Sequence, residues 1–254
     1  MVDLSGGSGL KRHFVSIRTG FRMSRAGLHL LWAALTVASA FPLLPLQARR
    51  ALKVRWSRQL LEVLGVRLQF TGAPCGAGLL VANHISWLDI YAINALLPTN
   101  FVAKDDVRAW PLIGWLSAQA ETIFIERGSH AAVMRTKLKL VEELRRKSCI
   151  AVFPEGTTSN GEALLPFHSA LFQSAIDAGV EVQPVTVRYL AGDGTASAAA
   201  VYIGDTSLWQ SMLAIARADS LTAHLDLLPV LDTEGRDRRE LAHQARLQIA
   251  ARMA

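Results

Sequence analysis

The chain has 254 residues, 51% of them hydrophobic, so it can bury the core of one α/β domain or of two small ones. Its net charge of +6 is concentrated at the start, because residues 1–58 hold ten Lys and Arg residues against the single acid Asp3. Nucleic-acid-binding proteins spread cations over a folded face with aromatic residues between them, so this distribution argues against a nucleic-acid partner.

Residues 26–46 are the first predicted element, a helix without Lys, Arg, Asp or Glu. About 20 apolar residues suffice to cross a bilayer core, so its length permits a span. Pro42 and Pro45 are expected to break the helix near its end, and arginines on both sides give no orientation signal. We therefore expect a monotopic or re-entrant anchor whose cations bind anionic headgroups. A signal peptide cleaved near residues 38–40 and a buried soluble helix are the alternatives.

The rest of the chain alternates short apolar runs with helical patterns. An amphipathic helix on the membrane face is predicted at residues 49–64. Strands are predicted at 66–70, 78–82, 121–125, 149–153, 182–189, 199–204 and part of 221–230. Further helices are predicted at 86–97, 129–147, 167–178, 207–217 and 236–253. This order is typical of an α/β domain whose mixed, largely parallel sheet is flanked by helices. We predict an N-terminal membrane-anchoring segment at residues 1–58 and one folded domain at residues 59–254.

Several catalytic motifs are absent from the sequence. It contains no G-x-S-x-G elbow, no GxxxxGK[ST], no H-E-x-x-H and no strand-linked GxGxxG. A serine hydrolase, a P-loop NTPase, a zincin and a dinucleotide enzyme are therefore disfavoured. Cys75 and Cys149 are unclustered and lack zinc spacing, so neither a disulfide framework nor a metal site is expected.

Residues 83–89, NHISWLD, directly follow a predicted strand. Ser86 and Asp89 match a capping box, so one interpretation is simply the start of a helix. That interpretation leaves Asn83 and His84 unexplained. An imidazole at a strand end is well placed to open into the cleft where α/β sheets bind ligands. Asp89 would accept a hydrogen bond from one ring nitrogen and leave the other as a base, with a substrate hydroxyl as the nucleophile.

Two other predicted strands end in polar residues. FPEGTTS, residues 153–159, forms a turn that would expose Glu155 and the backbone amides around Thr157, although Pro and Gly commonly make ordinary turns. The run IFIER ends in Arg127. An arginine at a strand end is usually solvated or salt-bridged, but it is also a good bidentate ligand for phosphate.

In this order, the motifs NH-x4-D, IFI-x-R, FPEGT and VQPV (residues 182–185) closely resemble the four blocks of the glycerolipid acyltransferases. These are the 1-acylglycerol-3-phosphate, or lysophosphatidic acid, acyltransferases and their relatives. The run AKDDVRAWPLIGW, residues 103–115, is also similar to that family's segment between its first two blocks. The resemblance extends over about residues 60–230 and implies an acyltransferase domain.

The resemblance implies transfer of a fatty acyl group from acyl-CoA or acyl-carrier protein to the free hydroxyl of a lysolipid, with 1-acylglycerol-3-phosphate as the leading acceptor. By that match His84 is the general base and Asp89 its orienting partner. The substrate-binding residues that it implies are Lys104, Arg127, Glu155, Gly156 and Thr157. A thioester is already activated, so no cofactor or metal is expected. The apolar N-terminal segment matches the helical membrane motif of such enzymes, and we expect the cytoplasmic face of a bacterial inner membrane.

Three residues depart from the family pattern. Thr158 stands where the family usually has an arginine, Glu121 replaces a glycine, and His168 replaces a frequent lysine. Two cations that would suit a phosphate monoester are therefore missing. The run FPEGTTSNG resembles a bacterial branch that includes lyso-ornithine-lipid acyltransferases, whose acceptor has no phosphate. That acceptor is the enzyme alternative, and a non-catalytic lipid-binding protein on the same fold is the alternative from another class.

Overall fold

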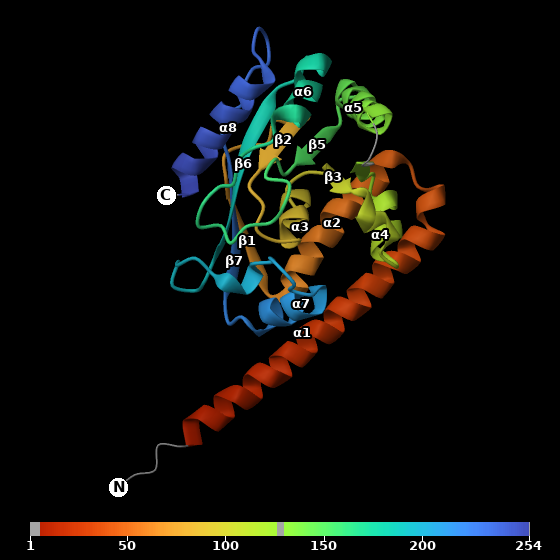
Figure 1. The fold of residues 1–254 in the computed structure, drawn as a ribbon. Helices are drawn as coiled ribbons and strands as arrows, with labels where there is room; N and C mark the ends of the chain where they lie inside the picture. The colour runs from red at the N-terminus through yellow and green to blue at the C-terminus, as the bar shows by residue number, and fades with distance from the viewer. Residues whose placement is uncertain (1–5, 126–129, 254) are drawn as a thin grey trace.

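The computed structural model describes residues 6–125 and 130–253. In this part of the chain a seven-stranded sheet has the order β1-β7-β6-β2-β5-β3-β4 (Figure 1). Neighbouring strands run parallel except for the antiparallel pair β6 and β7, so the predicted mixed, largely parallel sheet is confirmed. The strands are β1 (Val66–Thr71), β2 (Gly78–Ala82), β3 (Asn100–Lys104), β4 (Ile123–Ile125), β5 (Cys149–Val152), β6 (Val182–Leu190) and β7 (Leu221–Leu227).

Helices cover both faces of the sheet. Because side chains alternate along a strand, the apolar strand β2 contributes to both cores. Leu80 and Ala82 pack with α2, α3 and α7, whereas Leu79 and Val81 pack with α5, α6 and α8. The longer helices are α1 (Gly6–Ser39), α2 (Leu46–Leu64), α3 (Leu88–Asn94), α4 (Ile113–Gln119), α5 (His130–Arg145), α6 (Phe172–Ala178), α7 (Leu208–Arg217) and α8 (Arg238–Met253). Short 3-10 helices are η1 (Phe41–Leu43), η2 (Asp105–Ala109), η3 (Ser169–Leu171) and η4 (Ala198–Ala200).

The N-terminal segment folds as two helices joined by a short turn. Helix α1 ends at Ser39, Pro42 lies in η1, and Pro45 immediately precedes α2, so the predicted helix break is confirmed. Figure 1 shows α1 running along the outside of the domain. Across the described residues, no helix combines the length and the hydropathy that a bilayer crossing needs. Helix α2 continues through residue 58, so the predicted limit of the anchoring segment is not a break in structure.

Helix α2 is fixed to the sheet by a buried lysine. Lys53 donates to the carbonyl oxygens of Thr99 at 3.0 Å and Ala120 at 3.1 Å. Burial lowers the pKa of Lys53 to about 8, against the opposing charge of Glu121 at 3.8 Å. Glu121 also pairs with Arg50 at 3.0 Å and has a φ of +64°, a backbone conformation that glycine adopts without strain. The glycine usual in the family thus suits this backbone, while Glu121 adds a counter-ion for α2.

Several N-terminal cations bind within the protein. Arg22 donates to the carbonyls of Ala216 at 3.1 Å and Ala218 at 2.8 Å, where α7 ends and its last carbonyls need partners. Arg18 pairs with Asp219 at 2.6 Å. The cations bonded in this way are Arg18, Arg22, Arg49, Arg50, Lys53 and Arg58. Protein oxygens already engage these six side chains, and the expectation that N-terminal cations bind headgroups stays a prediction.

One predicted strand is absent from the described chain. Residues 199 and 200 instead belong to the 3-10 helix η4, in which the Ser197 side chain accepts the amide of Ala199, and residues 201–204 form no strand. The backbone amide of Tyr202 then donates to the carbonyl of Ile85 at 3.0 Å, so the segment binds a loop and not a neighbouring strand. Conversely, β3 and α4 were not predicted, because each is short and lacks a clear hydrophobic period.

Candidate active site

His84 and Asp89 lie side by side at the end of β2. His84 is two residues beyond the last residue of the strand, and its Nδ1 is 2.8 Å from Oδ2 of Asp89. The carboxylate is fully buried, whereas the imidazole is 19% exposed. Because an ionised carboxylate can only accept, this contact assigns the proton of the neutral ring to Nδ1. The Nε2 atom then carries a lone pair.

Asp89 also organises the backbone before α3. Its Oδ2 accepts the amide hydrogens of Ile85 at 2.8 Å and Ser86 at 3.0 Å. The Ser86 hydroxyl in turn accepts from the amide of Leu88 at 3.3 Å. The carboxylate therefore fixes the loop before α3 and contacts the imidazole at the same time. Helix α3 begins after its N-cap Trp87 without a side-chain cap, so the predicted capping box is formed only in the bond from the Ser86 amide to Asp89. The catalytic roles stay predictions.

Asn83 explains how the loop leaves the sheet. Its side chain donates to the carbonyl of Val187 at 2.9 Å and accepts from the amide of the same residue at 2.7 Å. Strands β2 and β6 pair in parallel up to Ala82 and Val185. The side chain of Asn83 therefore makes the hydrogen bonds that the backbone would make next between β2 and β6. Because the backbone is not needed for this pairing, the chain can turn out of the sheet at His84.

Aromatic packing restricts the imidazole further. The ring of His84 stacks on Phe153 with a centroid distance of 3.8 Å and an interplanar angle of 8°. Phe153 in turn lies against Phe101 of β3 at 5.9 Å. With one face covered and Nδ1 bonded, the ring has little rotational freedom. These contacts cross three strands and were not predicted from the sequence.

Glu155 joins two loops beneath the imidazole. One carboxylate oxygen accepts the amide of His84 at 2.8 Å, and the other accepts the amide of Leu165 at 3.0 Å. The side chain is buried, and burial raises the pKa of Glu155 although both amides oppose that shift. Its predicted contact with substrate stays a prediction, because the structure gives both oxygens backbone partners.

The turn after Glu155 brings the FPEGT motif beside His84. Gly156 has a φ of +72°, and a Cβ added there would lie 3.3 Å from the ring of His168. Gly156 and Thr157 are both exposed, whereas the hydroxyl of Thr158 donates to the carbonyl of Tyr202. Thr158 thus ties the loop to the chain after η4.

The predicted cationic ligand Lys104 is less closely placed. Lys104 ends β3 and is exposed. It lies at the same edge of the sheet as His84, because β2, β5 and β3 are parallel, but it is two strand spacings away, about 10 Å. Arg127 lies outside the described residues.

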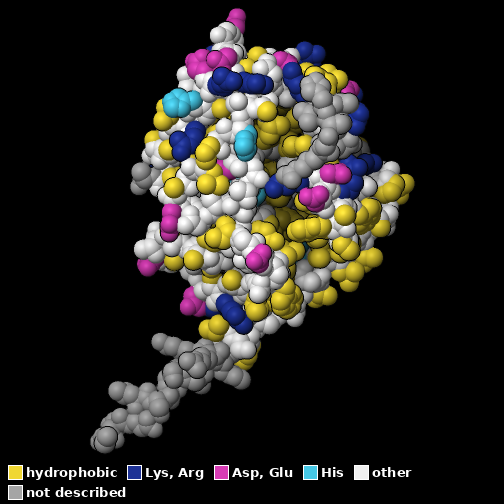
Figure 2. All heavy atoms as spheres, in the orientation of Figure 1, with side chains coloured by type: hydrophobic (Ala, Val, Ile, Leu, Met, Phe, Trp, Pro, Cys, Tyr) yellow, Lys and Arg dark blue, Asp and Glu magenta, His cyan; other side chains and the backbone are white. Residues whose placement is uncertain are grey.

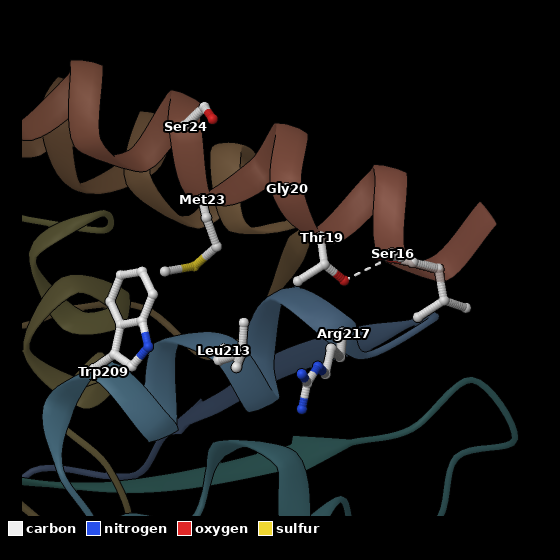
Figure 3. Close-up of a pocket in the computed structure, with 9 residues that line it drawn as sticks. Ser16, Thr19, Gly20, Met23, Ser24, Trp209, Leu213 and Arg217 are labelled. Carbon is white, nitrogen blue, oxygen red and sulfur yellow. Dashed lines mark hydrogen bonds between the residues drawn. The ribbon is translucent and has the colours of Figure 1, made fainter. Parts of the chain in front are cut away.

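A separate groove of about 560 Å³ lies between α1 and α7 (Figure 3). Met23, Trp209 and Leu213 face it from the two helices. The residues lining it include neither a histidine nor a carboxylate, so it offers no proton acceptor for acid–base chemistry. Within the described ranges, no group of three or more His, Cys, Asp and Glu side chains could hold a metal ion. The geometry of the side chains therefore favours the loops around His84 as the candidate active site.

Comparisons with known proteins agree with the motifs. A family model described as Acyltransferase matches residues 67–188. A lyso-ornithine lipid O-acyltransferase of Pseudomonas aeruginosa is 43% identical over 207 residues, which cover 81% of this chain and 79% of the relative. A 1-acyl-sn-glycerol-3-phosphate acyltransferase of Neisseria meningitidis is 36% identical over 213 residues, with 82% and 83% covered. The crystal structure of an LPA acyltransferase from Thermotoga maritima superposes with a TM-score of 0.71 over 95% of both chains at 19% identity, so it supports the fold.

Proposed function

This chain belongs to the acyltransferase family, and we propose that it transfers a fatty acyl group from a thioester to the free hydroxyl of a lysolipid. The observation that carries the proposal is the 2.8 Å contact between Nδ1 of His84 and the buried carboxylate of Asp89. It supports a base at Nε2, beside the exposed turn of the FPEGT motif. This placement suits a reaction whose nucleophile arrives with the substrate.

In the proposed mechanism His84 and Asp89 move and stabilise a proton, and neither residue forms a covalent bond to the acyl group. Nε2 of His84 removes the proton of the lysolipid hydroxyl as its oxygen attacks the thioester carbonyl. Asp89 stabilises the imidazolium that forms, by the bond that Nδ1–H already donates to it. When the tetrahedral oxyanion collapses, the C–S bond breaks and the imidazolium protonates the departing thiolate. The ester and the free thiol are the products.

The amide of Thr157 in the FPEGT turn is the proposed donor to the oxyanion, because Thr157 is exposed there. The neighbouring amide of Gly156 already donates to the carbonyl of Phe153 at 3.0 Å, which closes the turn. Glu155 anchors it by accepting the amides of His84 and Leu165, so the turn and the base keep a fixed separation. Such preorganised donors contribute more than flexible ones because they need no rearrangement as charge develops.

The acceptor we propose is a lysolipid of either of two kinds, lyso-ornithine lipid or 1-acylglycerol-3-phosphate, in keeping with the names of the relatives. Thr158 favours the first. Where the family usually places an arginine, this hydroxyl is bonded to the carbonyl of Tyr202 and supplies no positive charge. A phosphate monoester would need such a charge more than an ornithine headgroup would.

The acceptor test is an assay of purified protein with a panel of lysolipids and with both acyl-CoA and acyl-carrier protein as donors. Release of the free thiol is followed in each combination. We expect turnover with at least one lysolipid and faster turnover of lyso-ornithine lipid. Thr158→Arg should shift the preference toward 1-acylglycerol-3-phosphate by roughly tenfold, since one charge-assisted hydrogen bond is worth about 1.5–3 kcal/mol. Absence of thiol release with every lysolipid would favour the non-catalytic alternative.

We also propose that α1 lies on a membrane surface, at the cytoplasmic face where the thioester donors are found. One side of α1 carries apolar residues that are each more than half exposed: Ile17, Phe21, Leu28, Leu31, Trp32 and Leu35. Figure 2 shows hydrophobic side chains gathered where α4 and the C-terminal half of α1 lie. The opposite side of α1 holds the buried residues Thr19, Ala26 and Val37, so the apolar side faces outward.

Sedimentation with anionic vesicles tests this orientation. Leu31→Glu combined with Leu35→Glu should weaken binding at least tenfold, because burying one leucine is worth about 1.5–3 kcal/mol. Leu247→Glu is the matched control, since Leu247 is 52% exposed but belongs to α8. Salt should weaken binding only in part, because six of the N-terminal cations are already bonded to protein. Equal binding by both variants would contradict the proposed orientation.

A further inference from the structure

We infer that Tyr189 is a positioning residue for acyl transfer, because its hydroxyl holds the carboxylate oxygen of Asp89 that does not contact His84. This inference rests on the proposed function, in which His84 is the base. Tyr189 lies 100 residues from Asp89 in the sequence and outside the four motifs.

The two oxygens of Asp89 have different partners. Oδ2 accepts from Nδ1 of His84 and from the amides of Ile85 and Ser86. Oδ1 accepts from the hydroxyl of Tyr189 at 2.7 Å. Asp89 is 0% exposed and Tyr189 is 3% exposed, so bulk water does not replace this donor. A buried charged oxygen without a donor is costly, which makes the contact more than incidental.

The backbone of Tyr189 is fixed on both sides. It belongs to β6, which lies between β2 and β7, and it pairs with Ala223 in the antiparallel ladder. Its carbonyl accepts the amide of Ser197 at 2.8 Å. Strand β6 also holds Asn83 through the backbone of Val187. The same strand therefore positions both ends of the NHISWLD loop.

Tyr189 remains a donor over the pH range in which the enzyme would work. Burial first, and then the charge of Asp89, raise the pKa of Tyr189 well above its usual value. Its hydroxyl donates to Oδ1 of Asp89, whose other oxygen contacts Nδ1 of His84. Removal of this donor would leave more negative charge on the carboxylate, which would attract an imidazolium at His84 more strongly. The neighbouring titratable groups are Glu155, bonded to the His84 amide, and His168 across the turn.

Tyr189→Phe removes this hydroxyl and keeps the ring. We expect the acid limb of the pH profile of kcat/KM to move to higher pH by about half to one pH unit. One unit corresponds to a tenfold change in the proton concentration at which the rate is halved. We expect kcat to fall roughly 3- to 30-fold, less than for loss of a general base, with both KM values nearly unchanged. Tyr91→Phe is the matched control, because Tyr91 lies in α3 and packs on the edge of Trp87. It should keep the wild-type acid limb.

A double-mutant cycle with Asp89→Ala separates positioning from mere packing. Without the carboxylate, removal of the Tyr189 hydroxyl should cost no further rate, whereas a packing role would give the same fold loss in both backgrounds. If Tyr189→Phe does not fold, 3-fluorotyrosine at position 189 provides a stronger donor and should move the acid limb to lower pH. An unmoved acid limb in the folded variant overturns the inference alone. Wild-type turnover by His84→Ala would instead overturn the proposed function, and this inference with it.

Discussion

Two buried aspartates of this protein each contact a histidine, and their surroundings differ. Nδ1 of His84 lies 2.8 Å from Asp89, and Nε2 of His224 lies 3.2 Å from Asp226. The imidazoles are almost equally exposed, at 19% and 18%. Neither the presence of an Asp–His pair nor its exposure therefore identifies a catalytic base.

The two pairs differ in the charge of the groups around the carboxylate. Burial raises the pKa of Asp226, but hydrogen bonds from Thr71, Arg252 and His224 outweigh that effect and lower the pKa to about 2. Arg188 adds a second guanidinium at 2.9 Å. The donors to Asp89 are two amides, a phenol and an imidazole, none of them a permanent cation. Asp89 thus keeps its charge available for an imidazolium, whereas Asp226 is already neutralised by arginines.

The two histidines also differ in their place along a strand. His84 lies beyond the end of β2, where parallel sheets leave room for ligands. His224 lies inside β7, paired with Gln69 of β1 and Arg188 of β6. The comparison indicates that the Asp226 cluster ties β1, β6, β7 and α8 together, and it supports the proposal that His84 and Asp89 carry the chemistry.

The largest expected effect comes from the histidines. His84→Ala should lower thiol release by about 10²–10⁴-fold, the usual contribution of a general base. His224→Ala should stay within about threefold of wild type, because its carboxylate partner keeps two arginines. Circular dichroism and vesicle binding check that both variants fold. Equal losses of thiol release in the two variants would contradict the proposal that the two Asp–His pairs have different roles.

The aspartates give the next contrast. Asp89→Asn should slow acyl transfer roughly 10²-fold, since an amide neither stabilises the imidazolium nor fixes the ring tautomer. Asp226→Asn should leave the rate near that of wild type. The comparison requires kcat at saturating acceptor for both variants. If Asp89→Asn lost stability with unchanged specific activity, fixing the loop before α3 would be the whole role of Asp89.

The smallest expected effect is a change in the free energy of unfolding, which comes from Asp226. Its folded pKa of about 2 lies below the ordinary value of 3.8, so it stabilises the fold by about 2 kcal/mol at pH 7. That contribution is present above pH 3.8 and is lost as the pH falls toward 2. Urea unfolding should show a gap of this size between wild type and Asp226→Asn at pH 7 and a smaller gap near pH 2.5. A gap independent of pH would contradict the charge-based account.

The sequence predicted much of the fold because most strands and helices carry their own pattern. Strand β2 is uniformly apolar, and Pro42 and Pro45 mark the break between α1 and α2. Residues 199–204 were wrongly predicted as a strand, since their bonds to the loops at Ile85 and Thr158 depend on tertiary structure. The apolar pattern of this run could not distinguish these partners from a ladder.

The site was predictable only where its residues are close in sequence. His84 and Asp89 are five residues apart, and their contact could be anticipated from this short spacing. The contact of Tyr189 with Asp89 could not be anticipated, because two residues 100 positions apart leave no local pattern in the sequence. The structural roles of Glu155 and Thr158 were missed for the same reason, since Glu155 accepts the amide of His84 and Thr158 donates to Tyr202, both distant in the chain.

The account depends most on which ring nitrogen of His84 carries the proton. Protein labelled with ¹⁵N-histidine, in detergent at a pH where the imidazoles are neutral, reports the tautomers of His84 and His224 together, assigned by their alanine variants. The account predicts Nδ1–H for His84, which leaves Nε2 free as the base, and Nε2–H for His224. An Nε2–H tautomer at His84 would contradict it, because that nitrogen could not accept the proton of a lysolipid hydroxyl.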